Sequence, residues 1–240
     1  MNQNRAIAAG AAVILVLVLG YLGYLFLAPD GDVAEGSRVD TAFEKELLVA
    51  GPLGDMTKGD PDAPVTVIEY ASLTCNHCAD FAVNTLPKLE ENYIDTGKVH
   101  YILRDFPFDP IATAGFMLSH CAGPERYFGF VDTLFERQTQ WAFTQTPMED
   151  LKAIARQGGF SEERFDQCMK DQRIFDHVKE VATRGAKTFG IRSTPTFFIN
   201  GEKVEGAIPW NEFESLIEKA LAGEAIAPGT AGAATQAEEE

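Results

Sequence analysis

The residues Val65-Thr66-Val67-Ile68-Glu69-Tyr70-Ala71 form a β-branched, nearly continuous apolar run, and they are soon followed by Cys75-Asn76-His77-Cys78. A run of this kind is typical of a central strand that is buried on both faces. After Thr74, a plausible N-cap, apolar residues recur at helical spacing as far as Tyr93. Two thiols separated by two residues at a helix start lie close enough to bond, and the helix N-terminus stabilises the first as a thiolate. We interpret this pair as a redox-active disulfide.

A β-α-β unit surrounds the cysteine pair. Pro87 predicts a kink in the helix, Gly97 ends it, and residues 99–104 predict a second strand. We expect the two strands of this unit to be parallel and the crossover between them to be right-handed. The cysteines therefore lie at the carboxyl end of a parallel strand, where such sheets place their sites.

In the remainder of the chain, the spacing of apolar residues changes twice. Residues 110–188 predict four or five helices, with starts at Pro124 and at the capping box that begins with Thr146. Two short segments, at 196–199 and 203–205, then flank Asn200-Gly201, which is the strongest short hairpin signal. A last helix is expected from about residue 209, and residues 222–240 are expected to be a disordered tail.

The N-terminus indicates the compartment. Residues 6–28 carry no charged side chain, and about 23 residues make roughly 35 Å of helix, enough to cross a bilayer. Arg5 precedes this segment and acidic residues follow it, so the positive-inside rule places the rest of the chain outside the cytoplasm. A cleaved signal peptide is the alternative, although its apolar core is usually shorter and Pro29 is a poor cleavage neighbour. Either way the cysteines face an oxidising compartment.

Composition limits the function classes. The net charge of -16 argues against binding to nucleic acid, whose phosphates need a cationic surface. An inert structural disulfide or half of a zinc site is the alternative to a redox pair. The sequence contains no second C-x-x-C and no H-x-x-x-H, so we expect neither a metal nor a cofactor.

The order of these elements resembles a known fold. A C-x-x-C at the first strand-helix junction, a helical insertion, and Thr194-Pro195 before a hairpin and a closing helix resemble the thioredoxin fold, and more narrowly the DsbA-like thiol-disulfide oxidoreductases. The resemblance covers about residues 55–221. It implies an α/β fold, namely a thioredoxin fold with an inserted all-helical subdomain, here preceded by one N-terminal transmembrane helix. The expected organisation is an anchor with a short cytoplasmic start (1–29), a tether (30–54), the first half of the fold (55–109), the helical insertion (110–188), the second half (189–221) and the tail (222–240).

The resemblance also implies roles for single residues. Cys75 corresponds to the exposed nucleophile, Cys78 to the buried resolving cysteine, and His77 matches the histidine expected to tune the sulfur. Asn76 departs from the proline that family oxidases usually have at that position. Thr194 departs as well, because DsbA oxidases more often have Val there, whereas Thr resembles the DsbC-type isomerases. The direction of electron flow is therefore left open.

Three further predictions concern the surroundings of the pair. Glu69 is expected to be a buried carboxyl that relays the proton of Cys78, the alternative being a charge at the solvent end of the strand. Pro195 is expected to be cis and to leave the backbone of Thr194 open to an extended substrate peptide, the alternative being a trans edge-strand proline. Cys121 and Cys168 are expected to form a structural disulfide that closes a loop of about 48 residues, worth roughly 4 kcal/mol, rather than to stay free in the core.

These expectations define a function. The chain is predicted to be anchored in a bacterial cytoplasmic membrane, with its catalytic domain on the periplasmic or extracellular side, and to donate its disulfide to folding proteins through a mixed disulfide. Its partners would be cysteine-containing substrate proteins and a membrane redox partner, either a DsbB-like quinone-linked oxidase or an electron donor. A disulfide isomerase or reductase on the same fold is one alternative, and a redox-silent peptide-binding chaperone is another.

Overall fold

The structure is a computed structural model that describes residues 41–226. The predicted membrane anchor and the first part of the tether lie outside this range, as do residues 227–240. Within residues 41–226, every helix is too short or too polar to cross a membrane.

A five-stranded sheet forms the centre, in the order β1-β3-β2-β4-β5. The strands are β1 (Met56–Lys58), β2 (Val65–Ala71), β3 (Val99–Asp105), β4 (Thr196–Ile199) and β5 (Glu202–Glu205). β2 and β3 pair in parallel and the other pairs are antiparallel, which confirms the predicted β-α-β unit and the hairpin. At the hairpin turn, Asn200 and Gly201 both have positive φ, of 47° and 87°, as a type I′ turn requires. The short edge strand β1 was not predicted.

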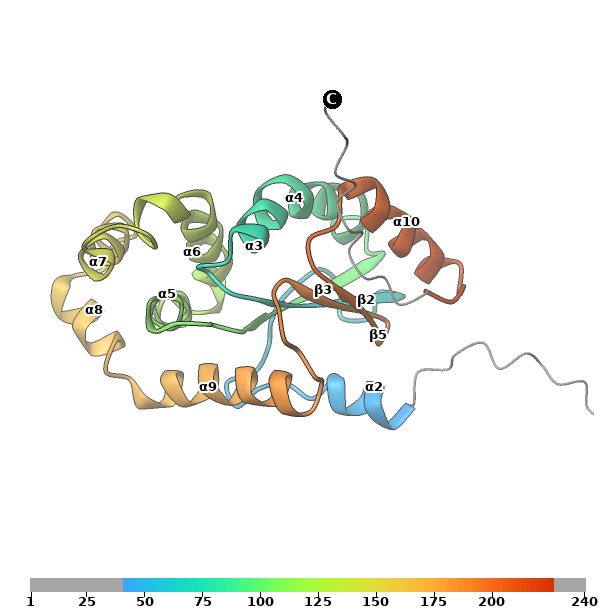
Figure 1. Cartoon of the computed structure of the whole chain (residues 1–240), viewed down its shortest axis with the longest axis horizontal. Coiled ribbons are helices and arrows are strands. Elements are labelled where there is room, and N and C mark those ends of the chain that lie inside the picture. Colours follow the sequence, from blue (N-terminus) through green and yellow to red (C-terminus); the bar gives the residue numbers. More distant parts are fainter. Residues whose placement is uncertain (1–40, 227–240) are drawn as a thin grey trace, which may run out of the picture. The chain divides into compact units, whose positions relative to one another are not determined.

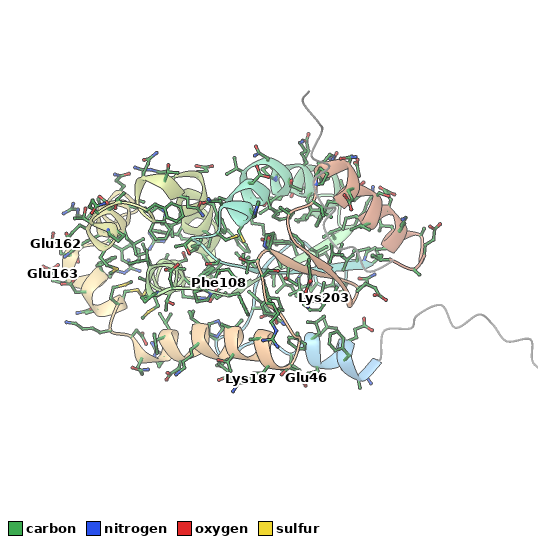
Figure 2. All side chains as sticks on the ribbon, viewed as in Figure 1. Glu46, Phe108, Glu162, Glu163, Lys187 and Lys203 are labelled. Carbon is green, nitrogen blue, oxygen red and sulfur yellow. A yellow bond between two sulfur atoms is a disulfide. The ribbon has the colours of Figure 1, made fainter. Side chains whose placement is uncertain are left out.

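Helices cover both faces of the sheet (Figure 1). Helices α3 (Asn76–Asp80), α4 (Leu86–Leu89) and α10 (Trp210–Leu221) lie on one face, and α2 (Thr41–Leu47) and α9 (Gln172–Lys187) lie on the other. The insertion also contains α5 (Pro110–Cys121), α6 (Pro124–Glu136), the 3₁₀ turn η3 (Gln138–Gln140), α7 (Pro147–Gln157) and α8 (Glu162–Cys168). The five α-helices between residues 110 and 188 agree with the predicted number. Glu162 and Glu163 point outward from α8 (Figure 2).

The helix after the cysteines is not a simple kinked α-helix. Between α3 and α4 lies a π turn, η1 (Phe81–Thr85), and a second π turn, η2 (Glu90–Ile94), follows α4. Pro87 stands in the first turn of α4, directly after η1, and has no N–H with which to continue the helical hydrogen bonds. The wider π turn therefore occupies the place at which the sequence predicted a kink.

One predicted N-cap residue is wrong, and a second occupies its predicted position without the predicted hydrogen bond. Cys75 rather than Thr74 is the N-cap of α3, because the Thr74 hydroxyl donates to Asp109 Oδ2 at 2.6 Å. Thr146 is the N-cap residue of α7, as predicted, but its side chain makes no capping hydrogen bond and its hydroxyl donates to Asp150. In both places the hydroxyl donates a hydrogen bond to a nearby carboxylate and accepts none from a backbone amide of the described helix.

The segment 41–54 is part of the folded domain and not a tether. Leu47 of α2 is only 1% exposed, and the ring of Phe43 packs edge-on against that of Phe189 at 5.7 Å. The buried Arg104 donates to the carbonyl oxygens of Leu47 (2.7 Å) and Val49 (3.1 Å).

The first residues of the predicted tail, 222–226, are also part of the folded domain. Ile226 is 3% exposed and joins the core on the α3 and α10 side of the sheet. Both corrections have one cause. Isolated apolar residues in a polar, Gly- and Ala-rich sequence give no periodic signal, although each is enough to hold a short segment in place.

Candidate active site

The cysteine pair lies at the junction of β2 and α3. The amide of Cys75 donates to Ser72 O at 3.0 Å, and the carbonyl of Cys75 accepts from the amide of Ala79 at 3.1 Å, so a turn leads directly into the helix. Cys75 has the extended backbone of an N-cap residue and is half-buried, whereas Cys78 is fully buried. An incoming thiolate can therefore reach Cys75 but not Cys78.

The two thiols differ in acidity. A hydrogen bond from the Cys78 thiol, helped by Thr194 and by the backbone amides of Cys78 and His77, lowers the pKa of Cys75 to about 5, although partial burial opposes this. Burial raises the pKa of Cys78 well above its ordinary value, and the hydrogen bond to Cys75 and the charge of Glu69 add to the effect. Cys75 is thus a thiolate at neutral pH while Cys78 keeps its proton.

His77 is exposed, and the part of it that acts on the sulfur is its backbone amide. Among the residues that the structure describes, no hydrogen bond joins its imidazole to Cys75. The tuning role of the His77 side chain therefore remains a prediction.

Glu69 lies in β2 on the face that carries α3 and is only 2% exposed. The Tyr101 hydroxyl, from the parallel strand β3, donates to Glu69 Oε2 at 2.5 Å. Burial raises the pKa of Glu69 to about 8, the hydrogen bond from Tyr101 opposes the shift, and the charge of Cys75 adds to it. The carboxyl is therefore protonated at neutral pH and coupled electrostatically to both thiols. The alternative of a solvated charge at the end of the strand is wrong.

Thr194 and Pro195 face the cysteines from the loop before β4. Their peptide bond is cis, and the Cys75 thiol donates to Thr194 O at 3.3 Å. The Thr194 hydroxyl is buried and has no oxygen or nitrogen partner among the described residues, and its interaction with the sulfur lowers the pKa of Cys75. This hydroxyl is therefore available to a thiolate.

Two contacts to the active-site turn were not predicted, one from the insertion and one from the loop just before it. Gln138, in η3, donates through Nε2 to Leu73 O at 2.9 Å and to Cys75 O at 3.0 Å. Asp109, the N-cap of α5, accepts from Thr74. A glutamine in a polar linker carries no motif, so only the fold reveals this contact.

A disulfide joins Cys121, at the end of α5, to Cys168, at the end of α8. The bond links two helices of the insertion that are 47 residues apart in the sequence. It contributes no group to the turn that holds Cys75.

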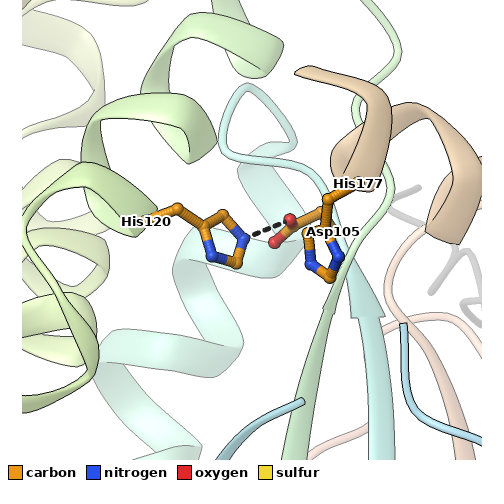
Figure 3. Close-up of side chains that lie close together, drawn as sticks. All are labelled: Asp105, His120 and His177. Atoms are coloured by element: carbon orange, nitrogen blue, oxygen red, sulfur yellow. Dashed lines mark hydrogen bonds and ion pairs between the residues drawn. The ribbon is translucent and has the colours of Figure 1, made fainter. Parts of the chain in front are cut away.

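The side chains of Asp105, His120 and His177 lie close together at the end of β3 (Figure 3). Their spacing in the sequence did not predict this cluster. His120 Nε2 lies 2.7 Å from Asp105 Oδ2, and the Tyr127 hydroxyl donates to the other Asp105 oxygen at 2.8 Å.

The donor set of this cluster does not fit a metal ion. His177 Nδ1 accepts the amide of Leu53 at 3.1 Å, so the neutral ring carries its proton on Nε2 and has no free lone pair. Burial lowers the pKa of His177, which favours that neutral ring. The cluster thus acts as a hydrogen-bonded junction between β3, α5, α9 and the N-terminal segment.

Comparison with known proteins agrees with this site. Residues 53–219 match a family model described as Thioredoxin. The chain is 36% identical to α-DsbA1 of Wolbachia pipientis, whose crystal structure aligns with a TM-score of 0.69 over 75% of this chain and 96% of that one. It is also 32% identical, over 171 residues, to a putative protein-disulfide oxidoreductase of Rickettsia bellii. That match covers 70% of this chain and spans 64% of the relative's length.

A more distant structure supports the fold alone. Oxidised BdbD of Bacillus subtilis is 23% identical and aligns with a TM-score of 0.64 over 72% of this chain and 97% of that one. With its parallel β-α-β unit, its C-x-x-C at a helix start and its family match, the chain belongs to the thioredoxin family. Within that family it is a DsbA-like protein, as the sequence resemblance implies.

Proposed function

We propose that this protein is an extracytoplasmic thiol-disulfide oxidoreductase that donates the Cys75–Cys78 disulfide to folding proteins. The observation that carries the proposal is the contrast between the two sulfurs, with the pKa of Cys75 lowered to about 5 and that of Cys78 raised by burial. A stabilised thiolate favours the reduced enzyme, and this makes the disulfide a strong oxidant.

The exchange runs in two steps. A substrate thiolate attacks Cys75 Sγ, the Cys75–Cys78 bond breaks, and Cys78 leaves as a thiolate that takes a proton from Glu69. A second substrate thiolate then attacks the substrate sulfur of the mixed disulfide, and Cys75 leaves. Because of its low pKa, Cys75 needs no proton at neutral pH. Two electrons pass from the substrate dithiol to the enzyme disulfide, and the Thr194 backbone beside Pro195 holds the substrate segment.

The proposal includes the location and a membrane partner. The uncharged segment 6–28 anchors the chain, and the charge distribution around it directs the catalytic domain to the periplasmic or extracellular side. A membrane-bound, DsbB-like quinone-linked oxidase then reoxidises the dithiol. Extraction of cell membranes at alkaline pH tests the anchor: a retained span keeps the chain in the pellet, and cleavage after residue 28 releases it.

The reduction potential of the full chain in detergent, measured against glutathione, tests the direction of electron flow. The proposal expects a value near the strongly oxidising potential of DsbA, about -120 mV. A value near that of thioredoxin, about -270 mV, contradicts the donor role and indicates a reductase.

The Thr194 hydroxyl favours a second candidate, a disulfide isomerase on the same fold, because a donor beside the sulfur also suits repeated thiolate attack. Refolding of a scrambled disulfide protein by the reduced chain separates the two. The Cys78→Ala variant separates both from a redox-silent chaperone, since an oxidoreductase accumulates mixed disulfides through Cys75.

A further inference from the structure

The helical insertion reaches into the active-site turn through one buried amide. Gln138 is 5% exposed and follows α6 directly. Its Nε2 atom bridges the carbonyl oxygens of Leu73 and Cys75, at 2.9 and 3.0 Å. A side-chain amide nitrogen carries two N–H groups, so this single atom can satisfy both acceptors.

These two carbonyls delimit the turn that presents the nucleophile. The Cys75 carbonyl also accepts the amide of Ala79, the first hydrogen bond of the helix, and the Cys75 amide is held by Ser72. Rotation of the peptide planes at residues 73–75 would therefore move the helix start relative to Cys75 Sγ. The amides of His77 and Cys78, which act on that sulfur, belong to the same first turn.

The loop that leads into the insertion holds the residue between these carbonyls. Asp109 accepts the Thr74 hydroxyl through Oδ2 at 2.6 Å, while its Oδ1 accepts the amide of Ala112 and caps α5 at 2.8 Å. Residues 73, 74 and 75 are thus each bound by a side chain of the loop before α5 or of the insertion. The pair Gln138 and Asp109, here called the insertion clamp, fixes the turn from two elements.

We propose that Gln138 is a positioning residue for the nucleophile: its amide holds the turn so that the backbone amides of His77 and Cys78 point at Cys75 Sγ. This inference rests on the proposed oxidoreductase function and gives the insertion a part in it. Without the two N–H groups, the buried Leu73 and Cys75 carbonyls lose a partner and the turn relaxes. Cys75 then loses part of its amide stabilisation, and its acidity moves toward that of a free cysteine.

The test compares Gln138→Met with the matched control Gln140→Met, both in the full chain in detergent. Met keeps the length of the side chain and removes both donors, and Gln140 is an exposed residue of the same turn. The rate of Cys75 alkylation is followed against pH by mass spectrometry, which separates Cys75 from the other cysteines. We expect Gln138→Met to raise the midpoint by about one pH unit or more, a tenfold fall in thiolate at pH below both midpoints, and Gln140→Met to leave it unchanged.

The outcomes distinguish this inference from the proposed function. A folded Gln138→Met protein with the wild-type midpoint overturns the positioning role and leaves the oxidoreductase intact. A wild-type midpoint near that of free cysteine, about 8.5, instead contradicts the proposed role of the Cys75–Cys78 disulfide as a strong oxidant. Should Gln138→Met fail to fold, Gln138→Leu serves in its place, because it removes both donors and adds no charge; an unchanged midpoint in that variant also overturns the role.

Discussion

The Tyr101 hydroxyl donates to Glu69 across the two parallel strands of the sheet, at 2.5 Å, on the face that carries the cysteine pair. Both side chains are buried, so the hydrogen bond between them is shielded from solvent. Burial raises the pKa of Tyr101 well above its ordinary value, so its hydroxyl remains a donor throughout the useful pH range. Glu69 is therefore a buried proton donor whose pKa is raised by burial and held down in part by the hydrogen bond from Tyr101.

Glu69→Gln is expected to stabilise the fold in a pH-dependent way. The pKa of Glu69 is raised from 4.5 to about 8, so ionisation is easier in the unfolded chain and the wild type loses stability as pH rises from 4.5 to 8. Gln carries no such penalty. At about 1.4 kcal/mol per pKa unit, the advantage of the variant grows by a few kcal/mol across this window. Urea unfolding at pH 5 and pH 8 measures it, and a constant difference between the two contradicts the buried carboxyl.

Tyr101→Phe supplies the matched control for Glu69. The lost hydrogen bond stabilised the carboxylate, so the pKa of Glu69 is expected to rise further and the loss of stability to extend to higher pH. Titration of the carboxyl by infrared spectroscopy checks the direction, and a fall in the pKa would show that another group controls Glu69.

The reduced protein is expected to gain stability from Cys75 as pH rises. The pKa of Cys75 is lowered from 9.0 to about 5, so this contribution is fully present above pH 9 and is lost as pH falls toward 5. Cys75→Ser lacks it. The difference in unfolding free energy between the reduced wild type and Cys75→Ser should therefore increase with pH between 5 and 9, and a flat difference would indicate an ordinary thiol.

Thr194→Val is expected to make the protein less oxidising. The variant removes a hydroxyl that lowers the pKa of Cys75, and each unit of increase in that pKa lowers the reduction potential by about 30 mV. Thr194→Ser keeps the hydroxyl and is the control. Potentials measured against glutathione decide the question, since equal values for the Val and Ser variants would remove Thr194 from the electrostatics of the site.

The double variant Cys121→Ala and Cys168→Ala is expected to lose stability without losing chemistry. The disulfide closes a loop of 47 residues, for which the chain-entropy model gives about 4 kcal/mol. Guanidinium unfolding measures the loss, and the alkylation midpoint of Cys75 should stay at its wild-type value. A shifted midpoint would instead connect this bond to the active site.

Much of this fold was predictable because its signals are local. The apolar run of β2, the C-x-x-C and the Asn200-Gly201 turn each report the conformation of the residues that carry them. Their order along the chain then predicts the topology, because a β-α-β crossover has one hand. The cysteine pair, Glu69 and Pro195 were predictable for the same reason and through the family resemblance.

The remaining features depend on partners that are distant in the sequence. Gln138 matters because it meets Leu73 O, 65 residues away, and Leu53 belongs to the fold because its amide meets His177, 124 residues away. Asp105 likewise pairs with His120 and accepts a hydrogen bond from Tyr127, and both partners are distant in the sequence. A pattern read along the chain cannot report such contacts, since neither partner carries a periodic or motif signal of its own.

The two edge strands of the sheet, β1 and β5, bear on the proposed action on folding proteins. β1 is only three residues long, and its Lys58 pairs with Glu90. β5 has the sequence Glu202-Lys203-Val204-Glu205, and its Lys203 lies on the outer strand (Figure 2). Short, charged margins resist strand addition by another polypeptide. Under the proposed function, the molecule would hold a substrate segment beside its nucleophile without seeding co-aggregation along its own sheet.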